Sequence, residues 1–225
     1  RFTFYHFPGQ TYWHQAVLAE VGDARILFTG DAIDDIAHIR CVDCMNYNLI
    51  GRSNGPMKCV DVLEETEPDF IATGHWGIQA WKTEYVPRMR EWVRERDRVV
   101  TQLIGQDEPN LGYDMHWGRL EPFRNVVTNQ ERVAVRARVH NYYGTVATAR
   151  VALVLPDGWT ASPESVTLTV PPNGETTAAF VVHPPADAVA MRHMIGLNVS
   201  LNGTSYGELG MACVDVGKDH SVERR

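Results

Sequence analysis

The feature that most constrains the fold is a change in the spacing of apolar residues at about residue 121. After this point apolar and polar residues alternate, most clearly over Arg132–Val139. Alternation with a period of two is typical of strands that bury one face. Further strands are expected at Ala149–Leu155, Ser165–Val170, Thr176–Val182, His193–Leu201 and Gly207–Val216. Because turn sequences such as Pro156-Asp157-Gly158 separate these runs, with no helical pattern between them, we expect an all-β sandwich.

The first ~105 residues combine strand and helix patterns, which predicts an α/β unit. Gln15–Val21 and Ala24–Thr29 read as strands, the second as a mostly apolar, buried one. Helices are expected at Pro56–Glu65 and Pro87–Ile104, the latter ending at Gly105. Residues 106–121 are rich in Gly, Pro and polar side chains and read as a linker. We therefore expect two domains, 1–112 including much of the linker, and 113–225.

Composition excludes some classes of partner. The chain is 44% hydrophobic and 22% charged, with a net charge of −7, which argues against a nucleic-acid surface. No apolar run approaches the roughly 20 residues of a membrane span, so no membrane partner is expected. No signal peptide is visible, and Arg1–Tyr5 already alternates like a strand. We expect an N-terminal portion to precede Arg1, so the compartment, cytoplasmic or secreted, stays open.

Four cysteines, Cys41, Cys44, Cys59 and Cys213, leave their chemistry open. Cys41 and Cys44 form a lone C-x-x-C with no second pair at zinc-finger spacing. Buried or free thiols, a disulfide among the first three, and a metal or redox role are all compatible with this pattern.

Two predicted strands end in side chains that can bind a metal. Thr29-Gly30-Asp31 ends one strand with a carboxylate, and Thr73-Gly74-His75 ends another with an imidazole. Sites in α/β layers gather at the carboxyl ends of strands, so we expect these two side chains to converge. A carboxylate can bridge two ions, while an imidazole nitrogen binds one. Taken singly, Asp31 also suits a turn and His75 a polar surface position.

Together with an earlier loop, these motifs resemble the metallo-β-lactamase superfamily. The loop is Pro8-Gly9-Gln10-Thr11 followed by His14, where that family shows P-G-H-T. The resemblance covers about residues 1–104 and implies the second half of an αββα metallo-β-lactamase sandwich. The β-sandwich that follows is similar in pattern to the immunoglobulin-like modules appended to many bacterial enzymes.

The resemblance implies a metal-dependent hydrolase of a small molecule. Metal-activated water would attack an ester, thioester, lactone, amide or phosphodiester. The implied cofactor is zinc, as one or two ions, with iron or manganese as alternatives. The implied metal ligands are Asp31, His75, Gln10 and His14, with Asp31 also catalytic because it would bridge metals or orient the attacking water.

Departures from the family pattern limit this expectation. The H-x-H-x-D-H motif of the family is absent, and Gln10 stands where the family has a histidine. We therefore expect this fragment alone to be inactive and to need the missing N-terminal half of the domain as a partner. One metal at Asp31 and His75, two metals with Gln10, His14 or His6 as a substitute ligand, and an empty site all stay open. The alternative function is a non-catalytic binding or assembly protein with a degenerate metal site.

The predicted sandwich carries no catalytic set of residues. It could pack on the catalytic part, pair protomers into a homo-oligomer, or bind a polymer such as a glycan.

Overall fold

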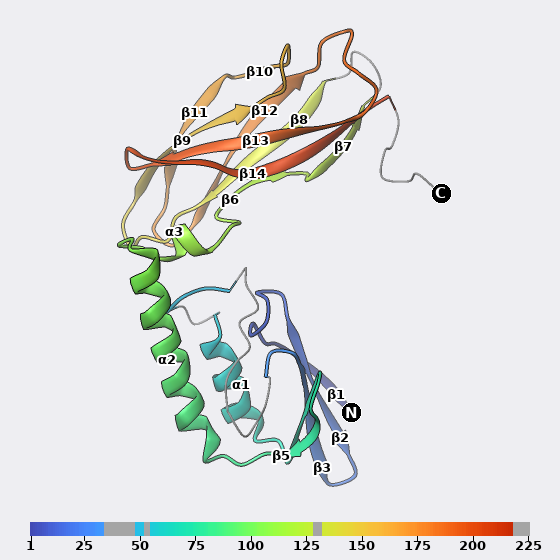
Figure 1. Cartoon of the computed structure of the whole chain (residues 1–225), viewed down its shortest axis with the longest axis vertical. Helices are drawn as coiled ribbons and strands as arrows, with labels where there is room; N and C mark the ends of the chain where they lie inside the picture. Colours follow the sequence, from blue (N-terminus) through green and yellow to red (C-terminus); the bar gives the residue numbers. More distant parts are fainter. Residues whose placement is uncertain (34–47, 52–54, 128–131, 218–225) are drawn as a thin grey trace. The chain divides into compact units, whose positions relative to one another are not determined.

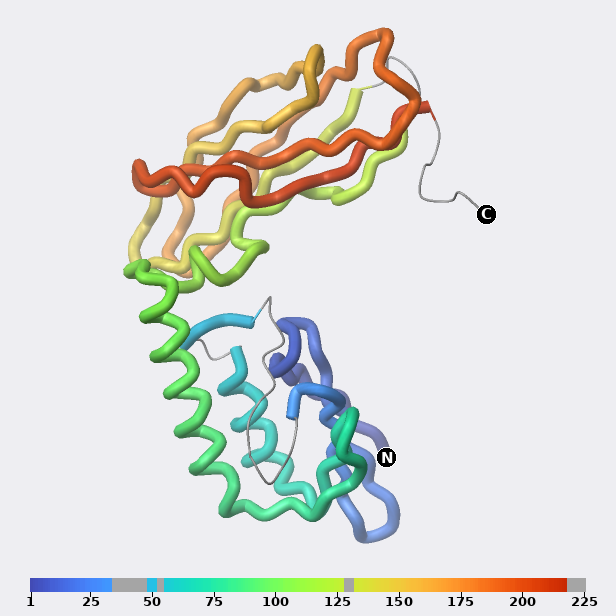
Figure 2. Tube along the Cα trace, in the orientation of Figure 1, coloured from blue at the N-terminus to red at the C-terminus, as the bar shows by residue number. Residues whose placement is uncertain are grey.

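The chain forms two compact units. The computed structural model describes residues 1–33, 48–51, 55–127 and 132–217 (Figures 1 and 2). One unit is Arg1–Asp114 and the other Met115–Arg225, whereas the sequence placed the boundary between residues 112 and 113. Cys41 and Cys44 lie outside the described residues, and Cys59 and Cys213 are buried.

The first unit is built on one five-stranded sheet with two long helices. Its strands follow the order β1-β2-β3-β4-β5, and β3 pairs parallel with β4 while the other neighbours are antiparallel. The strands are β1 (Phe2–His6), β2 (Gln15–Val21), β3 (Ala24–Gly30), β4 (Phe70–Thr73) and β5 (Gly77–Ala80). The helices are α1 (Met57–Thr66), α2 (Tyr85–Ile104) and a short α3 (Asn110–Tyr113).

One face of this sheet packs against the helices. Figure 1 shows α1 and α2 on the same side of the sheet. Leu18, Leu27 and Ile71 point to this side from three neighbouring strands and are buried in the core of the unit. Leu63 of α1 and Met89 of α2 lie in the same core, which accounts for the apolar stripes of both helices. Helix α2 ends at Gly105, whose φ of +65° suits glycine and whose N–H bonds to the Thr101 carbonyl.

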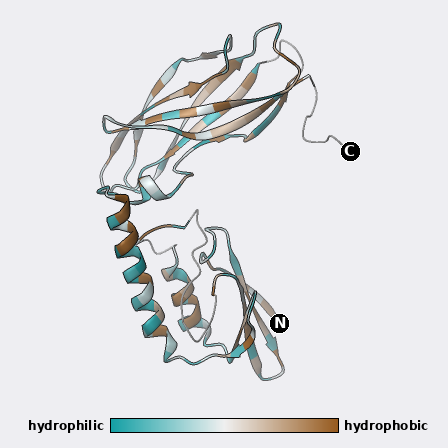
Figure 3. Cartoon of the chain, in the orientation of Figure 1, coloured by the Kyte–Doolittle hydropathy of each residue, from teal (hydrophilic) through white to brown (hydrophobic). Residues whose placement is uncertain are grey.

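The second unit is a sandwich of two sheets. One sheet has the order β10-β12-β8-β6 and the other β11-β9-β13-β14-β7. The alternation that predicted strands is seen as alternating burial, and Figure 3 shows hydrophobic and hydrophilic residues succeeding one another along these strands. The strands are β6 (Gly118–Glu121), β7 (Arg124–Val127), β8 (Val133–His140), β9 (Ala147–Val154), β10 (Thr160–Ser162), β11 (Ser165–Val170), β12 (Glu175–His183), β13 (Arg192–Leu201) and β14 (Thr204–Val216).

The consecutive strands β6 and β7 belong to different sheets. Strand β6 pairs antiparallel with β8, whereas β7 pairs parallel with β14. The fully buried carboxylate of Asp215 in β14 holds β7 in place, because it accepts a hydrogen bond from Arg124 at 3.2 Å and another from Arg192 at 2.7 Å. The chain therefore contributes to both layers before it forms the longer strands.

The α/β class predicted for the fold is wrong, because the chain is mostly β. The prediction gave weight to two long helices and read residues 106–121 as a linker. Strand β6 lies inside that segment, and β5 and β7 were also missed. These four-residue strands have no long alternating pattern of their own, and they form because β4, β8 and β14 offer pairing partners.

Within the described residues, no helix combines the length and the apolar character needed to cross a bilayer.

Candidate functional site

Gln10, Asp31 and His75 meet at one end of the first unit's sheet. Nε2 of His75 lies 3.2 Å from Oδ1 of Asp31, and Nε2 of Gln10 donates a hydrogen bond to Oδ2 of Asp31 at 3.0 Å. Strands β3 and β4 bring Asp31 and His75 together because they run parallel and end side by side, and the loop between β1 and β2 supplies Gln10. The side chains that the sequence placed at two strand ends are therefore neighbours in space.

The local backbone geometry explains why both motifs contain glycine. Gly30 has a φ of +50°, which a residue with a side chain rarely adopts. A Cβ atom on Gly74 would lie 1.9 Å from Oδ1 of Asp31, so only glycine lets the carboxylate rest against the turn after β4. The N–H of Gly74 also bonds to the Gly30 carbonyl at 2.9 Å. The glycines of both motifs are therefore explained by the close approach of the backbone where β3 and β4 end side by side.

His14 lies behind the cluster, where it contacts backbone. Its Nε2 donates to the Thr29 carbonyl oxygen at 3.0 Å, and its ring packs beside Gly30. This contact fixes the loop after β1 against the end of β3. His14 was predicted as a metal ligand together with Gln10, Asp31 and His75, and only the last three are joined directly by polar contacts.

The cluster provides two side chains of the kinds that hold zinc most often, Asp31 and His75. Structural zinc sites use four protein ligands and catalytic sites three, commonly His, Cys, Asp or Glu. In the ranges that the structure describes, no group of three or more such residues is close enough to hold one ion. The assignment of zinc to Gln10, His14, Asp31 and His75 therefore stays a prediction, as does the catalytic role of Asp31.

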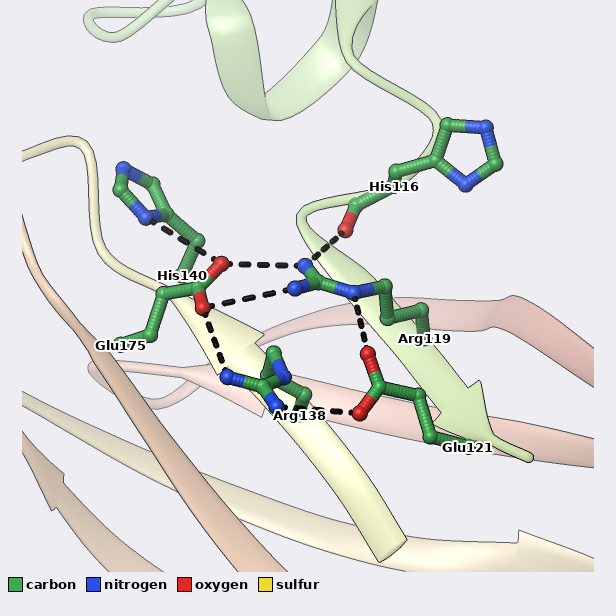
Figure 4. A network of polar contacts seen from close by, with 6 residues as sticks. All are labelled: His116, Arg119, Glu121, Arg138, His140 and Glu175. Carbon is green, nitrogen blue, oxygen red and sulfur yellow. Dashed lines mark hydrogen bonds and ion pairs between the residues drawn. The ribbon is translucent and has the colours of Figure 1, made fainter.

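A second polar cluster, which the sequence did not single out, lies on the outer face of the four-stranded sheet. It is an ion-pair ring of Arg119, Glu121, Arg138 and Glu175 (Figure 4). Glu175 accepts hydrogen bonds from Arg119 at 3.0 Å and from Arg138 at 3.1 Å. Glu121 accepts from the same two arginines, at 3.1 and 3.0 Å. Each side chain of the ring is about one-third exposed.

The strand register explains why the ring forms. Arg119 of β6 stands directly opposite Arg138 of β8, so two like charges would face each other without the glutamates. The hydrogen bond from Arg138 lowers the pKa of Glu121. Burial raises the pKa of Glu175, but the hydrogen bonds and charges of Arg119 and Arg138 outweigh it and lower the pKa overall. The ring was not predicted from the sequence, because the segment that forms β6 was interpreted as a linker.

Part of the second unit matches a known protein family. The family described as "NPCBM-associated, NEW3 domain of alpha-galactosidase" matches residues 127–202, from the last residue of β7 to just beyond β13. No curated protein matches the chain.

Several solved structures are distantly similar to part of the chain. An MSP family member of Caenorhabditis elegans, WR4, is 9% identical over 44% of this chain and 97% of its own, with a TM-score of 0.32. The CupB2 chaperone of Pseudomonas aeruginosa is 17% identical over 46% and 58%, with a TM-score of 0.33. A family 123 glycoside hydrolase of Clostridium perfringens is 12% identical over 41% and 22%, with a TM-score of 0.32.

The assignment to the metallo-β-lactamase superfamily is wrong, and the predicted metal-dependent hydrolase function is wrong with it. The family match falls on the sandwich, and that family is described as a domain of alpha-galactosidase. The assignment rested on three short motifs, and the glycines in two of them, Gly30 and Gly74, are explained by the local backbone geometry at the ends of β3 and β4. The alternative, a non-catalytic binding or assembly protein, agrees better with the family match.

Proposed function

We propose that the chain is a non-catalytic binding or assembly protein, and that its second unit is an accessory module of an enzyme that acts on glycosides. The observation that carries this proposal is the match of residues 127–202 to a family described as a domain of alpha-galactosidase. The matched segment includes strands β8 to β13, so it covers most of both sheets of the sandwich. The expectation that the intact protein is an enzyme stays a prediction.

The ion-pair ring is the surface of the module that best suits a ligand. Its guanidinium and carboxylate groups are planar, partly exposed, and held in place by each other. Such groups form paired hydrogen bonds, which suits neighbouring hydroxyls of a sugar. Holding Arg119 and Arg138 in advance also reduces the side-chain entropy lost on binding. We therefore propose a galactose-containing glycan as the ligand.

Titration calorimetry with a galactose-containing polysaccharide tests this proposal. The chain should bind, and Arg138→Ala should weaken the affinity by about tenfold or more, because it removes two charge-assisted contacts of the ring. Arg150→Ala is the matched control, since Arg150 lies on the other sheet and contacts Ser165. It should leave the affinity unchanged.

Two results would contradict the proposal. One is the absence of heat with every galactose-containing glycan at millimolar concentration, for a chain whose circular dichroism shows it folded. The other is turnover of a generic ester or phosphodiester that disappears in Asp31→Ala. That loss would mean that the cluster at Asp31 is catalytic.

A further inference from the structure

The outer face of the β1–β5 sheet, opposite the helices, is apolar and exposed. It carries four phenylalanines that are far from buried: Phe2 is 69% exposed, Phe4 68%, Phe28 44% and Phe70 38%. Val21 and Ile78 are more than half exposed on the same face. Soluble proteins rarely leave a contiguous patch of this kind uncovered unless it binds something.

The strand register shows that the patch is continuous. One row across all five strands reads Phe2, Ala19, Ile26, Phe70 and Ala80. The next row reads Phe4, Val17, Phe28, Ala72 and Ile78. Every outward position of both rows is apolar. Polar side chains appear only at the end of the sheet, where His6 stands opposite Gln15.

This patch differs from the exposed apolar end of α2. Leu103 is 80% exposed near the end of α2, but it is one side chain on a helix whose other exposed positions are largely charged. The two rows instead form a surface without charge, with large and small side chains side by side. Large side chains next to alanines make ridges and hollows, into which the side chains of another sheet can fit.

We propose that the outer face of the β1–β5 sheet binds the same face of a second copy of this chain. Two sheets in contact, each covered by its own helices on the far side, give both apolar faces a covering layer. A single helix, about 10 Å wide, would cover less than half of five strands spaced about 4.8 Å apart. The chain's net charge of −7 disfavours an anionic lipid surface as the alternative. A two-fold axis makes one self-complementary patch sufficient.

The exposed area is large enough for such a pair. At about 200 Å² for a fully exposed phenylalanine side chain, the four rings offer about 400 Å² per copy. Val21 and Ile78 bring the area buried by two copies above about 1,000 Å², the size that a specific interface needs. The pairing is independent of glycan binding by the sandwich, because it uses only the first unit.

Sedimentation velocity of the whole chain from about 1 to about 100 µM tests the pairing. We expect a species of twice 25.3 kDa, at both low and high salt, because the contact is apolar. The double variant Phe4→Glu/Phe28→Glu should weaken dimerisation by about 100-fold or more, since it places charge inside the contact. Phe4→Thr/Phe28→Thr, which keeps residues that favour strands, should also weaken it and covers the case in which the charged variant does not fold.

Two control variants locate the contact. Leu103→Glu on α2 and Met211→Glu on the outer face of the sandwich both add charge at exposed apolar positions, and the dimer should persist in each. Dissociation by Met211→Glu would place the contact in the sandwich and overturn the proposal. A monomeric wild-type chain at about 100 µM would overturn it too, and would leave the portion expected before Arg1, or an apolar sheet of a different protein, as the partner. Polydisperse aggregates would equally contradict a specific pair.

Discussion

The two units of the chain use their sheets in opposite ways. In the second unit, two sheets turn their apolar faces toward each other, and Phe180 and Leu197 are buried between them. In the first unit, the helices cover one face of a sheet that is apolar on both. The sequence carries this difference. Val133–Val139 alternates, as a strand with one buried face should, whereas Ile26-Leu27-Phe28 is a continuous apolar run, as in strands buried on both faces.

The largest expected effect is a difference in unfolding free energy between substitutions on the two faces of β3. Leu27 points to the helices and is fully buried, whereas its neighbour Phe28 points outward. Leu27→Ala should lower the free energy of unfolding by about 2–5 kcal/mol, and Phe28→Ala by about 1 kcal/mol. Urea denaturation at about 1 µM chain, where pairing is weakest, measures both. Equal losses would mean that the outer face is already covered within one chain.

The second prediction concerns the contribution of a loop side chain, Asn141, to the stability of the sandwich. The side chain of Asn141 is buried, and its amide nitrogen donates to the carbonyls of Thr145 and Pro171 at 2.8 and 3.1 Å. Asn141→Ala should cost about 1–3 kcal/mol, because buried backbone groups lose their partner. Asn125→Ala, which removes an exposed contact to Pro122, should change stability by less than about 0.5 kcal/mol. Thermal unfolding compares them, and a harmless Asn141→Ala would contradict this account.

A third change acts on the polar cluster at the end of β3 and β4. Gly74→Ala forces the Asp31 carboxylate away, and should destabilise the first unit by about 1 kcal/mol, because the clashing atoms belong to a side chain that can turn aside. Nuclear magnetic resonance of the His75 ring should report the loss of the Asp31 contact. Gly144→Ala in the second unit is the control, since nothing lies within 4 Å of its added Cβ. An unchanged His75 signal in Gly74→Ala would show that the carboxylate is not held there.

The smallest effect concerns acid and the ion-pair ring. Folding lowers the pKa of Glu121 and Glu175 below the ordinary value of 4.5, so the stability that these carboxylates provide is complete above that pH and is lost as the pH falls below it. Glu175→Gln should cost about 0.5–1 kcal/mol at neutral pH, since the ring is partly exposed. Melting temperatures between pH 6 and about pH 3.5 should fall less in Glu175→Gln than in the wild type. A steeper fall of the melting temperature in the variant would contradict the lowered pKa of Glu175 in the folded chain.

The sequence predicted the long elements better than the short ones. The strand at Gln15–Val21 has the predicted bounds, and the second long helix begins only slightly earlier than expected. The predicted meeting of Asp31 and His75 also occurs, because parallel strands end at one edge of a sheet. The ion-pair ring could not be predicted, since Arg119 and Glu121 lie in a strand that exists only through its pairing with β8. The family was misjudged because motifs of three residues also arise from the needs of the backbone.

The parallel pairing of β7 with β14 has a mechanical consequence. Residues 124–127 run alongside residues 213–216 in the same direction, so tension applied through the chain before β7 and after β14 drags the two strands past each other. Under such a load, the backbone hydrogen bonds between them resist together instead of parting one after another. The ion pair between Arg124 and the buried carboxylate of Asp215 adds a side-chain contact between the same two strands. We therefore expect β7 and β14 to separate at a higher force than a pair of strands whose hydrogen bonds break one at a time.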